Sequence, residues 1–292
     1  MPTVQQNFLG LPPKLSNYAR AAYAVLPVPY DGTASYRKGA QDGPAAILAA
    51  SQQVEWFDEE LQREPCRTGI ATLAPLEPGS AGPDAVHEKV YGAARRIVRD
   101  GKFLLGLGGE HGITSALVRA AMGRRRTLSV LQIDAHADLR NSYGGSRFSH
   151  ASVMRRVLEL GADIVVVGLR SLSAECSRVL RSRGTRVTAI SARECLESAN
   201  WIARAVAALG PRVYVTVDID GFDPAYAPGT GTPEPGGLDW HGVCSLLRTV
   251  AAARQIIGAD VVEVAPIAGQ HTTEFLAARL AYKLIGYHRS SC

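Results

Sequence analysis

The sequence lacks any long hydrophobic run. Its longest apolar stretches, such as the one at 164–167, have the length of a strand, whereas a helix that crosses a bilayer needs roughly 20 apolar residues. The first fifteen residues also lack the basic start, the apolar middle and the small-residue cleavage site of a secretion signal. We therefore expect a cytoplasmic protein with no membrane partner.

Paired cysteines are absent as well. The five cysteines are scattered along the chain and form no CxxC pair. An odd, scattered set does not match a disulfide framework or a zinc ribbon. We interpret these cysteines as core or surface thiols.

Charge of one sign is only slightly in excess, with a formal net charge of +5. The basic residues occur in short groups, such as Arg124-Arg125-Arg126 and Arg155-Arg156, and no aromatic residues interleave with them. Nucleic-acid-binding domains typically show a larger basic patch or stripe, so we expect no nucleic-acid partner. The absence of low-complexity tracts, with 46% hydrophobic residues among 292, indicates a globular protein with a substantial core.

Strand-like apolar runs alternate with segments of helical periodicity along most of the chain. Strands that are continuously apolar are typical of a parallel sheet buried on both faces. The alternation predicts an α/β fold with three layers, α/β/α, around a central and mostly parallel sheet. No linker rich in Pro, Gly or Ser divides the chain, so we expect a single domain over residues 1–292. The expected strands cover 22–28, 103–107, 128–133, 164–167, 187–190, 213–217 and 256–264. The expected helices cover 44–51, 83–99, 114–122, 151–160, 174–183, 199–209, 240–254 and 272–286.

Three of the expected strands are followed by residues that commonly bind metals. In open α/β sheets, ligands bind at the carboxyl ends of the strands. The strand at 103–107 leads into a glycine loop that contains His111. A dinucleotide-binding loop would need its third glycine where His111 stands, so that interpretation fails. The glycines instead favour a tight bend that points His111 into a site.

The other two strand ends carry carboxylates at alternate positions. One has Asp134-Ala135-His136-Ala137-Asp138 and the other has Asp218-Ile219-Asp220. Alternate residues of an extended segment project to the same side. A polar loop with a helix-capping aspartate would explain one of these carboxylates, but not this whole group after two apolar strands.

These four aspartates carry a charge of about −4 if all are ionised, and such charges would repel one another strongly in a cleft. Two divalent cations would cancel that charge. Oxygen ligands with one imidazole for each ion suit manganese better than metals that prefer thiolates. Two ions about 3.5–4 Å apart can share a carboxylate and activate water as a nucleophile. The sequence therefore predicts a two-metal hydrolase.

The motifs resemble those of the arginase–agmatinase family, the ureohydrolases, over nearly the whole chain. The resemblance implies an arginase-like fold, two Mn²⁺ ions per subunit, and hydrolysis of a guanidino group to urea and an amine. It also implies a homo-oligomer, often a trimer or a hexamer. The segments that carry it lie, in order, at 29–33, 108–111, 134–138, 217–220, 223–234 and 261–266.

By matching position, the resemblance also implies the ligands of each ion. One ion would be bound by His111, Asp134, Asp138 and Asp218. The other would be bound by His136, Asp134, Asp218 and Asp220. Asp134 and Asp218 would therefore bridge the two ions.

Three side chains match catalytic positions of the family. Asp138 would orient the attacking hydroxide, and Glu263 would hold the guanidinium, whose planar fork of donors suits a carboxylate. His150 matches a mobile histidine that carries protons to the leaving amine, a role that suits a group titrating near neutrality. The alternative for His150 is a helix-start histidine with no catalytic role.

Arginase activity itself fits the sequence poorly. Arginases typically carry Asn where this chain has Arg140, and aspartates where it has Ser171 and Ser173. The runs around 138–146 and 150–156 look like those of bacterial and archaeal agmatinases and of relatives that act on aminopropylagmatine. The predicted substrate is therefore a small guanidino cation: agmatine, which would yield putrescine and urea in polyamine biosynthesis.

An amine tail would favour an acidic or aromatic rim, for which Tyr143, Glu234 and Glu274 are candidates. One departure from the family is Gly112, where many relatives have Ser. It removes a hydroxyl near the metal loop but no ligand.

Other activities remain open at this point. A ureohydrolase of the same chemistry could act on aminopropylagmatine, guanidinobutyrate, guanidinopropionate, guanidine or arginine. A zinc deacetylase of similar fold would use a single metal and lack this double ligand set. A catalytically silent scaffold would usually show a broken ligand set, and none is broken here.

Overall fold

The computed structural model describes residues 6–79, 82–123 and 127–290, with the backbone alone at 289–290. The arginine group at 124–126 and Cys292, both noted in the sequence, lie outside the described residues. The other four cysteines are free, as expected. No helix in the described part of the chain combines the length and the apolar character needed to cross a membrane.

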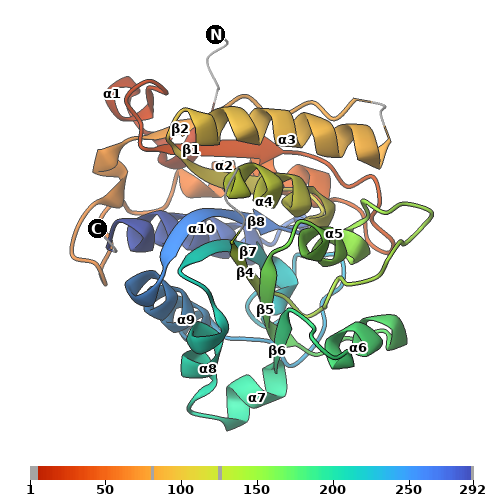
Figure 1. Cartoon of the computed structure of the whole chain (residues 1–292). Helices are drawn as coiled ribbons and strands as arrows, with labels where there is room; N and C mark the ends of the chain where they lie inside the picture. The colour runs from red at the N-terminus through yellow and green to blue at the C-terminus, as the bar shows by residue number, and fades with distance from the viewer. Residues whose placement is uncertain (1–5, 80–81, 124–126, 291–292) are drawn as a thin grey trace.

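A parallel sheet forms the middle layer of the molecule (Figure 1). Each pairing of neighbouring strands within it is parallel, and the strand order is β2-β1-β3-β8-β7-β4-β5-β6. The strands are β1 (Tyr23–Val28), β2 (Ile70–Thr72), β3 (Phe103–Gly108), β4 (Ser129–Ile133), β5 (Asp163–Leu169), β6 (Val187–Ser191), β7 (Arg212–Asp218) and β8 (Gln255–Val262).

Helices cover both faces of this sheet, and a separate hydrophobic cluster lies on each face. One cluster includes residues of α2, α8, α9 and α10, and the other includes residues of α3, α4, α5 and α6. The helices are α1 (Pro13–Ser16), α2 (Gly43–Ser51), α3 (Pro83–Arg99), α4 (Thr114–Met122), α5 (Val153–Glu159), α6 (Ala174–Arg181), α7 (Ala192–Glu197), α8 (Trp201–Ala208), α9 (Trp240–Ala253) and α10 (Thr272–Ser290).

The predicted three-layer α/β/α architecture is thus confirmed. All the expected strands and helices are present; α3 and α4 have the expected bounds, and the others have ends shifted by one or more residues. Three short elements, β2, α1 and α7, were not predicted, because segments of three to six residues show no periodicity. The expected strand at 256–264 stops at Val262, because Glu263 has a φ of 64° and turns the chain out of the sheet. The expected helix at 151–160 begins with a 3-10 turn, His150–Ser152, before α5.

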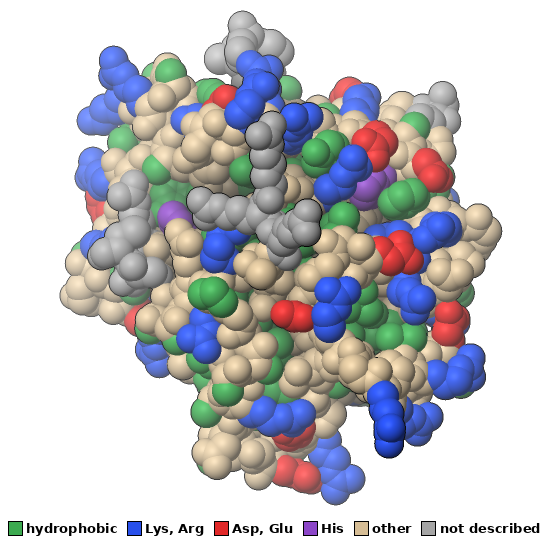
Figure 2. Space-filling view, in the orientation of Figure 1, with side chains coloured by type: hydrophobic (Ala, Val, Ile, Leu, Met, Phe, Trp, Pro, Cys, Tyr) green, Lys and Arg blue, Asp and Glu red, His purple; other side chains and the backbone are tan. Residues whose placement is uncertain are grey.

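The surface agrees with the modest net charge. On the face shown in Figure 2, Lys and Arg side chains are spread among Asp and Glu instead of forming one basic patch.

The carboxyl ends of β3, β8, β7 and β4 lie side by side, because these strands are neighbours in the sheet. A close backbone approach fixes the first of these ends. The Gly109 amide donates to the carbonyl of Val28 at 2.9 Å, and its carbonyl accepts from the amide of Glu263 at 2.7 Å. A Cβ atom on Gly109 would lie 2.0 Å from the carbonyl oxygen of Tyr30. The loop that carries His111 therefore requires glycine at position 109.

We predict that Gly109→Ala lowers the free energy of unfolding by about 1–3 kcal/mol, the usual cost of overpacking, because the new methyl meets backbone that cannot move aside. The control is Gly92→Ala in α3, where a Cβ would meet no atom within 4 Å. That change should stabilise the helix by about 0.5–1 kcal/mol. Urea denaturation of both variants makes the comparison. Equal urea midpoints for the two variants would show that the close contact between Gly109 and the backbone of Tyr30 does not require glycine.

Candidate metal centre

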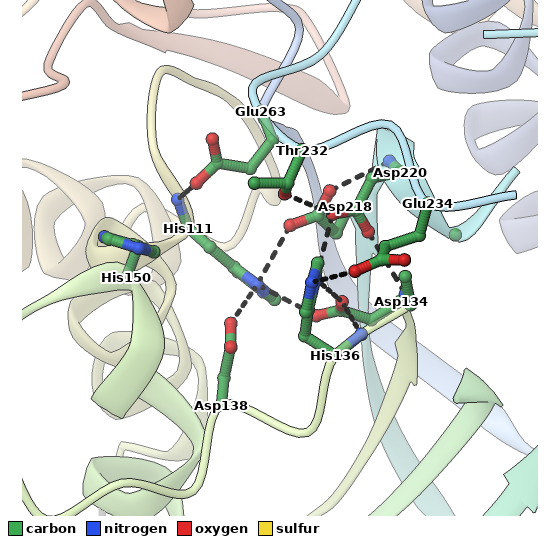
Figure 3. A network of polar contacts seen from close by, with 12 residues as sticks. His111, Asp134, His136, Asp138, His150, Asp218, Asp220, Thr232, Glu234 and Glu263 are labelled. Atoms are coloured by element: carbon green, nitrogen blue, oxygen red, sulfur yellow. Dashed lines mark hydrogen bonds and ion pairs between the residues drawn. The ribbon is translucent and has the colours of Figure 1, made fainter. Parts of the chain in front are cut away.

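The structure brings the six expected metal ligands together at one edge of the sheet (Figure 3). They come from three strand ends, and their side chains point toward a common centre. His111 follows β3, three ligands follow β4, and the last two lie at the end of β7: Asp134, His136, Asp138, Asp218 and Asp220.

His111 is fully buried at the centre of the first half of the site. Its Nδ1 lies 3.2 Å from Oδ2 of Asp134, 3.1 Å from Oδ2 of Asp138 and 3.4 Å from Oδ2 of Asp218. Three carboxylates thus converge on a single imidazole nitrogen.

His136 organises the second half. Its Nδ1 lies 3.0 Å from Oδ2 of Asp220 and 3.6 Å from Oδ1 of Asp134. His111, Asp134 and Asp218 form one group with ligand atoms within 4.8 Å of one another, and Asp134, His136 and Asp220 form a second. The two groups share Asp134, as adjacent cation sites with a bridging carboxylate would require.

Two of the carboxylates near this centre lie on unusual backbone. Asp138 has a φ of 50° and Glu263 a φ of 64°, the left-handed region that side chains other than glycine rarely adopt. The carbonyl of Asp138 accepts from the amides of Met154 at 3.0 Å and Arg155 at 3.3 Å, which start α5. The surrounding structure therefore holds Asp138 in a conformation that costs free energy, a feature common at functional sites.

Burial and mutual repulsion act strongly on these groups. Burial raises the pKa of Asp218 well above its ordinary value, and the neighbouring Asp220 and Asp134 raise it further. Burial likewise raises the pKa of Asp138, together with the charge of Asp134. Burial disfavours the charged form of His136, but hydrogen bonds to Asp134 and Asp220 outweigh it and raise the pKa of His136 to about 12. The site thus concentrates carboxyl groups, which the two imidazoles offset only in part.

The ion pairs of these aspartates within the described residues are all to His111 and His136, and none is to Lys or Arg. Buried carboxylates without such partners need another source of positive charge. Aspartate oxygens with one imidazole in each half form a donor set that fits two divalent cations of the manganese type.

A hydrogen-bonded chain behind His111 prepares it for such a cation. Nε2 of His111 lies 3.0 Å from the hydroxyl of Thr216, which donates its one hydrogen to Asp260 at 2.6 Å. The Thr216 oxygen therefore accepts from Nε2–H. In a neutral His111 this would leave the Nδ1 lone pair on the side of the aspartates, free for a cation. Tyr214 donates to the other oxygen of Asp260 at 2.9 Å. Partners of this kind commonly fix the tautomer of a metal-binding histidine.

Arg170 fixes the loop that carries Asp220. Its guanidinium donates to backbone carbonyls on both sides of the loop, including those of Asp220 at 2.7 Å, Phe222 at 3.2 Å and Glu234 at 2.7 Å. A rigid planar fork of donors suits several carbonyls at once. Arg170 thereby fixes the two ends of the loop at 222–237, which is rich in Gly and Pro, next to each other.

A cleft of about 330 Å³ opens over the centre, and its walls include Asp138, His150, Asp218, Asp220 and Glu263. Glu263 is also anchored, because its Oε1 accepts from the amide of His111 at 2.5 Å. Burial raises the pKa of Glu263 to about 8, with Glu110 and Asp220 adding to the effect. A carboxylate in this position favours a cationic ligand.

Of the three residues expected at the rim of the cleft, two lie near the centre and one does not. Tyr143 lines the cleft, with its ring 5.6 Å from that of His150. Glu234 lies near the centre, 3.8 Å from Nε2 of His136. The prediction for Glu274 was wrong: it lies on α10, bound to His271 at 2.8 Å, and does not line this cleft. An acidic residue in a polar stretch of sequence gave no sign that its helix faces elsewhere.

Several residues that support the centre were not predicted from the sequence. Asp260 was detectable, because a carboxylate inside an otherwise apolar strand needs a buried partner. Arg170 gave no local signal, since the loop carbonyls that it binds lie 50 and 64 residues away in the chain. The others are Thr33, Glu110 and Thr216.

Comparisons with known proteins agree with this geometry. The model of the arginase family matches residues 21–286. An N(1)-aminopropylagmatine ureohydrolase of Synechocystis sp. is 44% identical, with 94% of this chain and 91% of that protein covered. An agmatinase of Pyrococcus horikoshii is 33% identical, with 91% and 92% covered.

Among solved structures, the agmatine ureohydrolase of Thermoplasma volcanium superposes with a TM-score of 0.84 at 33% identity, covering 94% of this chain and 92% of that one. The family resemblance predicted from the motifs is therefore confirmed, and the chain belongs to the arginase family.

Proposed function

We propose that this protein is a manganese-dependent ureohydrolase that cleaves the guanidino group of an agmatine-type cation, releasing urea and a polyamine. The double set of histidine and aspartate ligands beside Glu263, in one cleft, carries this proposal. The names of the relatives favour aminopropylagmatine as the substrate, and agmatine is the second candidate.

His111, Asp134, Asp138 and Asp218 would hold one ion, and His136 and Asp220 the other together with Asp134 and Asp218. When bound, two such ions supply Lewis acidity and a water molecule of lowered pKa. A site for a single metal, as in a zinc deacetylase, would leave the second group of ligands unexplained.

Three side chains of the protein would bind the substrate, orient the water and transfer the proton. Glu263 would bind the guanidinium through paired hydrogen bonds and set the distance of its carbon from the centre. Asp138, whose carbonyl accepts from amides in the first turn of α5, would orient the water that attacks. His150, at the cleft wall, would pass a proton to the amine as it leaves.

One observation favours a substrate whose tail ends in a carboxylate instead of an amine. Arg37 and Arg140 both line the cleft, and the guanidinium of Arg140 lies 5.1 Å from the ring centre of Tyr143. Two cations at the rim would attract a carboxylate, as in guanidinobutyrate or guanidinopropionate, and would oppose an amine unless Tyr143 or Glu234 offsets them. A guanidino acid is therefore the alternative substrate class.

Urea release from the Mn²⁺-loaded protein decides between these substrates. We expect aminopropylagmatine to show the highest kcat/KM, ahead of agmatine, with guanidinobutyrate, guanidinopropionate, guanidine and arginine tested beside them. A preference for a guanidino acid would support the same hydrolysis of the guanidino group. It would indicate that Arg37 and Arg140 bind the carboxylate of the substrate tail. No urea from any compound, with the metals bound, would refute the proposed reaction.

Asp218→Asn tests the metal site through stability. Without metal, the variant should unfold at a higher temperature than the wild type, because it removes one of the crowded buried charges. With Mn²⁺, the wild type should be stabilised by ligand binding while the variant gains little, and urea release should fall at least about 100-fold. The control is Asp163→Asn, at the amino end of β5, which should behave like the wild type. A wild-type response of Asp218→Asn to Mn²⁺ would contradict the assignment.

Glu263→Gln tests the guanidinium site. Replacing a hydrogen bond to a charged group usually costs about 1.5–3 kcal/mol, so kcat/KM should fall about 10- to 100-fold while Mn²⁺ binding is retained. Glu274→Gln is the matched control, a buried glutamate outside the cleft, and its kcat/KM should not change. Unchanged kinetics in Glu263→Gln would remove Glu263 from the site.

The other expectations stay predictions: that residues 1–292 act as one catalytic domain, that the protein is cytoplasmic, and that it forms a trimer or hexamer.

A further inference from the structure

A buried glutamine of β4 lies directly beside the aspartate that the two halves of the centre share. Gln132 is fully buried, and its side-chain nitrogen Nε2 lies 2.7 Å from Oδ2 of Asp134. The same nitrogen lies 3.3 Å from the backbone carbonyl of His136. The sequence predicts position 132 only as part of an apolar strand, so these contacts were not expected.

The contact with His136 determines which end of the Gln132 amide faces the centre. A backbone carbonyl can only accept a hydrogen bond, so the group that meets it must be the NH₂ and not the oxygen. The second N–H of the same nitrogen then points to Oδ2 of Asp134. This orientation does not depend on the protonation of any carboxyl group, because the carbonyl has no proton to give.

Both oxygens of the Asp134 side chain thus receive a donor from the chain on either side of it. Oδ2 accepts from Gln132, and Oδ1 accepts from the backbone amide of His136 at 2.6 Å. A carboxylate oxygen has two acceptor positions, so each oxygen keeps one. Oδ2 lies 3.2 Å from Nδ1 of His111, and Oδ1 lies 3.6 Å from Nδ1 of His136. Each oxygen of Asp134 therefore lies beside the imidazole of a different half of the centre.

The other end of the Gln132 amide shows that this position was not filled for packing alone. Its oxygen Oε1 is buried and has no hydrogen-bond partner among the described residues. Burying an unpaired amide oxygen costs free energy, and methionine or leucine would fill an apolar strand without that cost. The two N–H groups of Gln132 are the feature that an apolar residue could not supply.

Gln132 also belongs to a row of polar side chains across the sheet. It is the register partner of Thr216 on β7, and Thr216 is the partner of Asp260 on β8. Side chains at paired positions of neighbouring strands point to the same face, and all three are fully buried. Thr216 contacts the ligand His111, and Gln132 contacts the ligand Asp134. The row therefore supports one ligand from each of two strand ends.

From this geometry we infer that Gln132 is a positioning residue, which turns the carboxylate of Asp134 so that one oxygen is directed to each half of the metal centre. Its contact is with a ligand and not with the substrate, so it acts through metal binding. The inference rests on the proposed function, because the two cations are part of that proposal.

Gln132→Met and Gln132→Leu test this role, because each removes both N–H groups and keeps an apolar side chain that suits the strand. We expect Mn²⁺ to bind about 10- to 100-fold more weakly, the usual effect of losing a partner of a metal ligand. Titration calorimetry on the full chain measures the affinity. The control is Gln52→Met, because the Gln52 amide also donates to backbone carbonyls, those of Asn7 at 2.5 Å and Leu48 at 3.2 Å. Neither partner is a ligand, so its Mn²⁺ affinity should not change.

Electron paramagnetic resonance on the same samples tests the bridge itself. Two Mn²⁺ ions about 3.5–4 Å apart that share a carboxylate should give the spectrum of a coupled pair. With two equivalents of Mn²⁺, we expect a larger share of isolated ions in both Gln132 variants than in the wild type and in Gln52→Met. A change of stability alone would not cause this difference.

The outcomes separate this role from the metal centre as a whole. Two ions in the wild type, with affinity and spectrum unchanged in both Gln132 variants, would overturn the role of Gln132 and leave the centre standing. An equal loss of affinity in Gln52→Met would overturn it as well, because the effect would then follow from stability. Fewer than two ions in the wild type would refute the proposed centre itself and, with it, any role of Gln132 there.

Discussion

The convergence of buried carboxylates at one edge of the sheet is the constraint on which the rest of the structure depends. Asp134, Asp138, Asp218 and Asp220 lie close together with two imidazoles beside them, and their ion pairs within the described chain are only to those imidazoles. Bringing these groups out of water costs free energy that cations must offset. The tight approach at Gly109, the unusual backbone of Asp138 and the long loop pinned by Arg170 all serve to hold this set in place.

Behind the centre, short chains of hydrogen bonds support two of the histidines. Thr216 and Asp260 lie behind Nε2 of His111. Thr33 and Glu110 are arranged similarly around His150. In each case a threonine hydroxyl links an imidazole nitrogen to a buried carboxyl group.

Much of this could be predicted from the sequence, and the reasons are physical. Continuous apolar strands alternating with helices indicated the parallel sheet, and polar residues directly after β3, β4 and β7 had to meet at one edge. Glu263 and His150 depended on family resemblance, because nothing local marks a strand that ends in a left-handed turn. The supporting residues escaped detection because their partners are distant in the chain, as for Thr33 and Glu110, which are 77 positions apart. The prediction that Glu274 lies at the rim of the cleft was wrong because a sequence does not show which way a helix faces.

We propose that the cluster formed by Asp134, Asp138, Asp218 and Asp220 with the two histidines is a site for two cations. Equilibrium dialysis of the full chain against Mn²⁺, followed by elemental analysis, tests it most directly. We expect two bound ions per chain in the wild type and fewer than two in Asp218→Asn, because Asp218 would serve both ions. One ion per chain, or none under conditions in which the protein is folded, would contradict it.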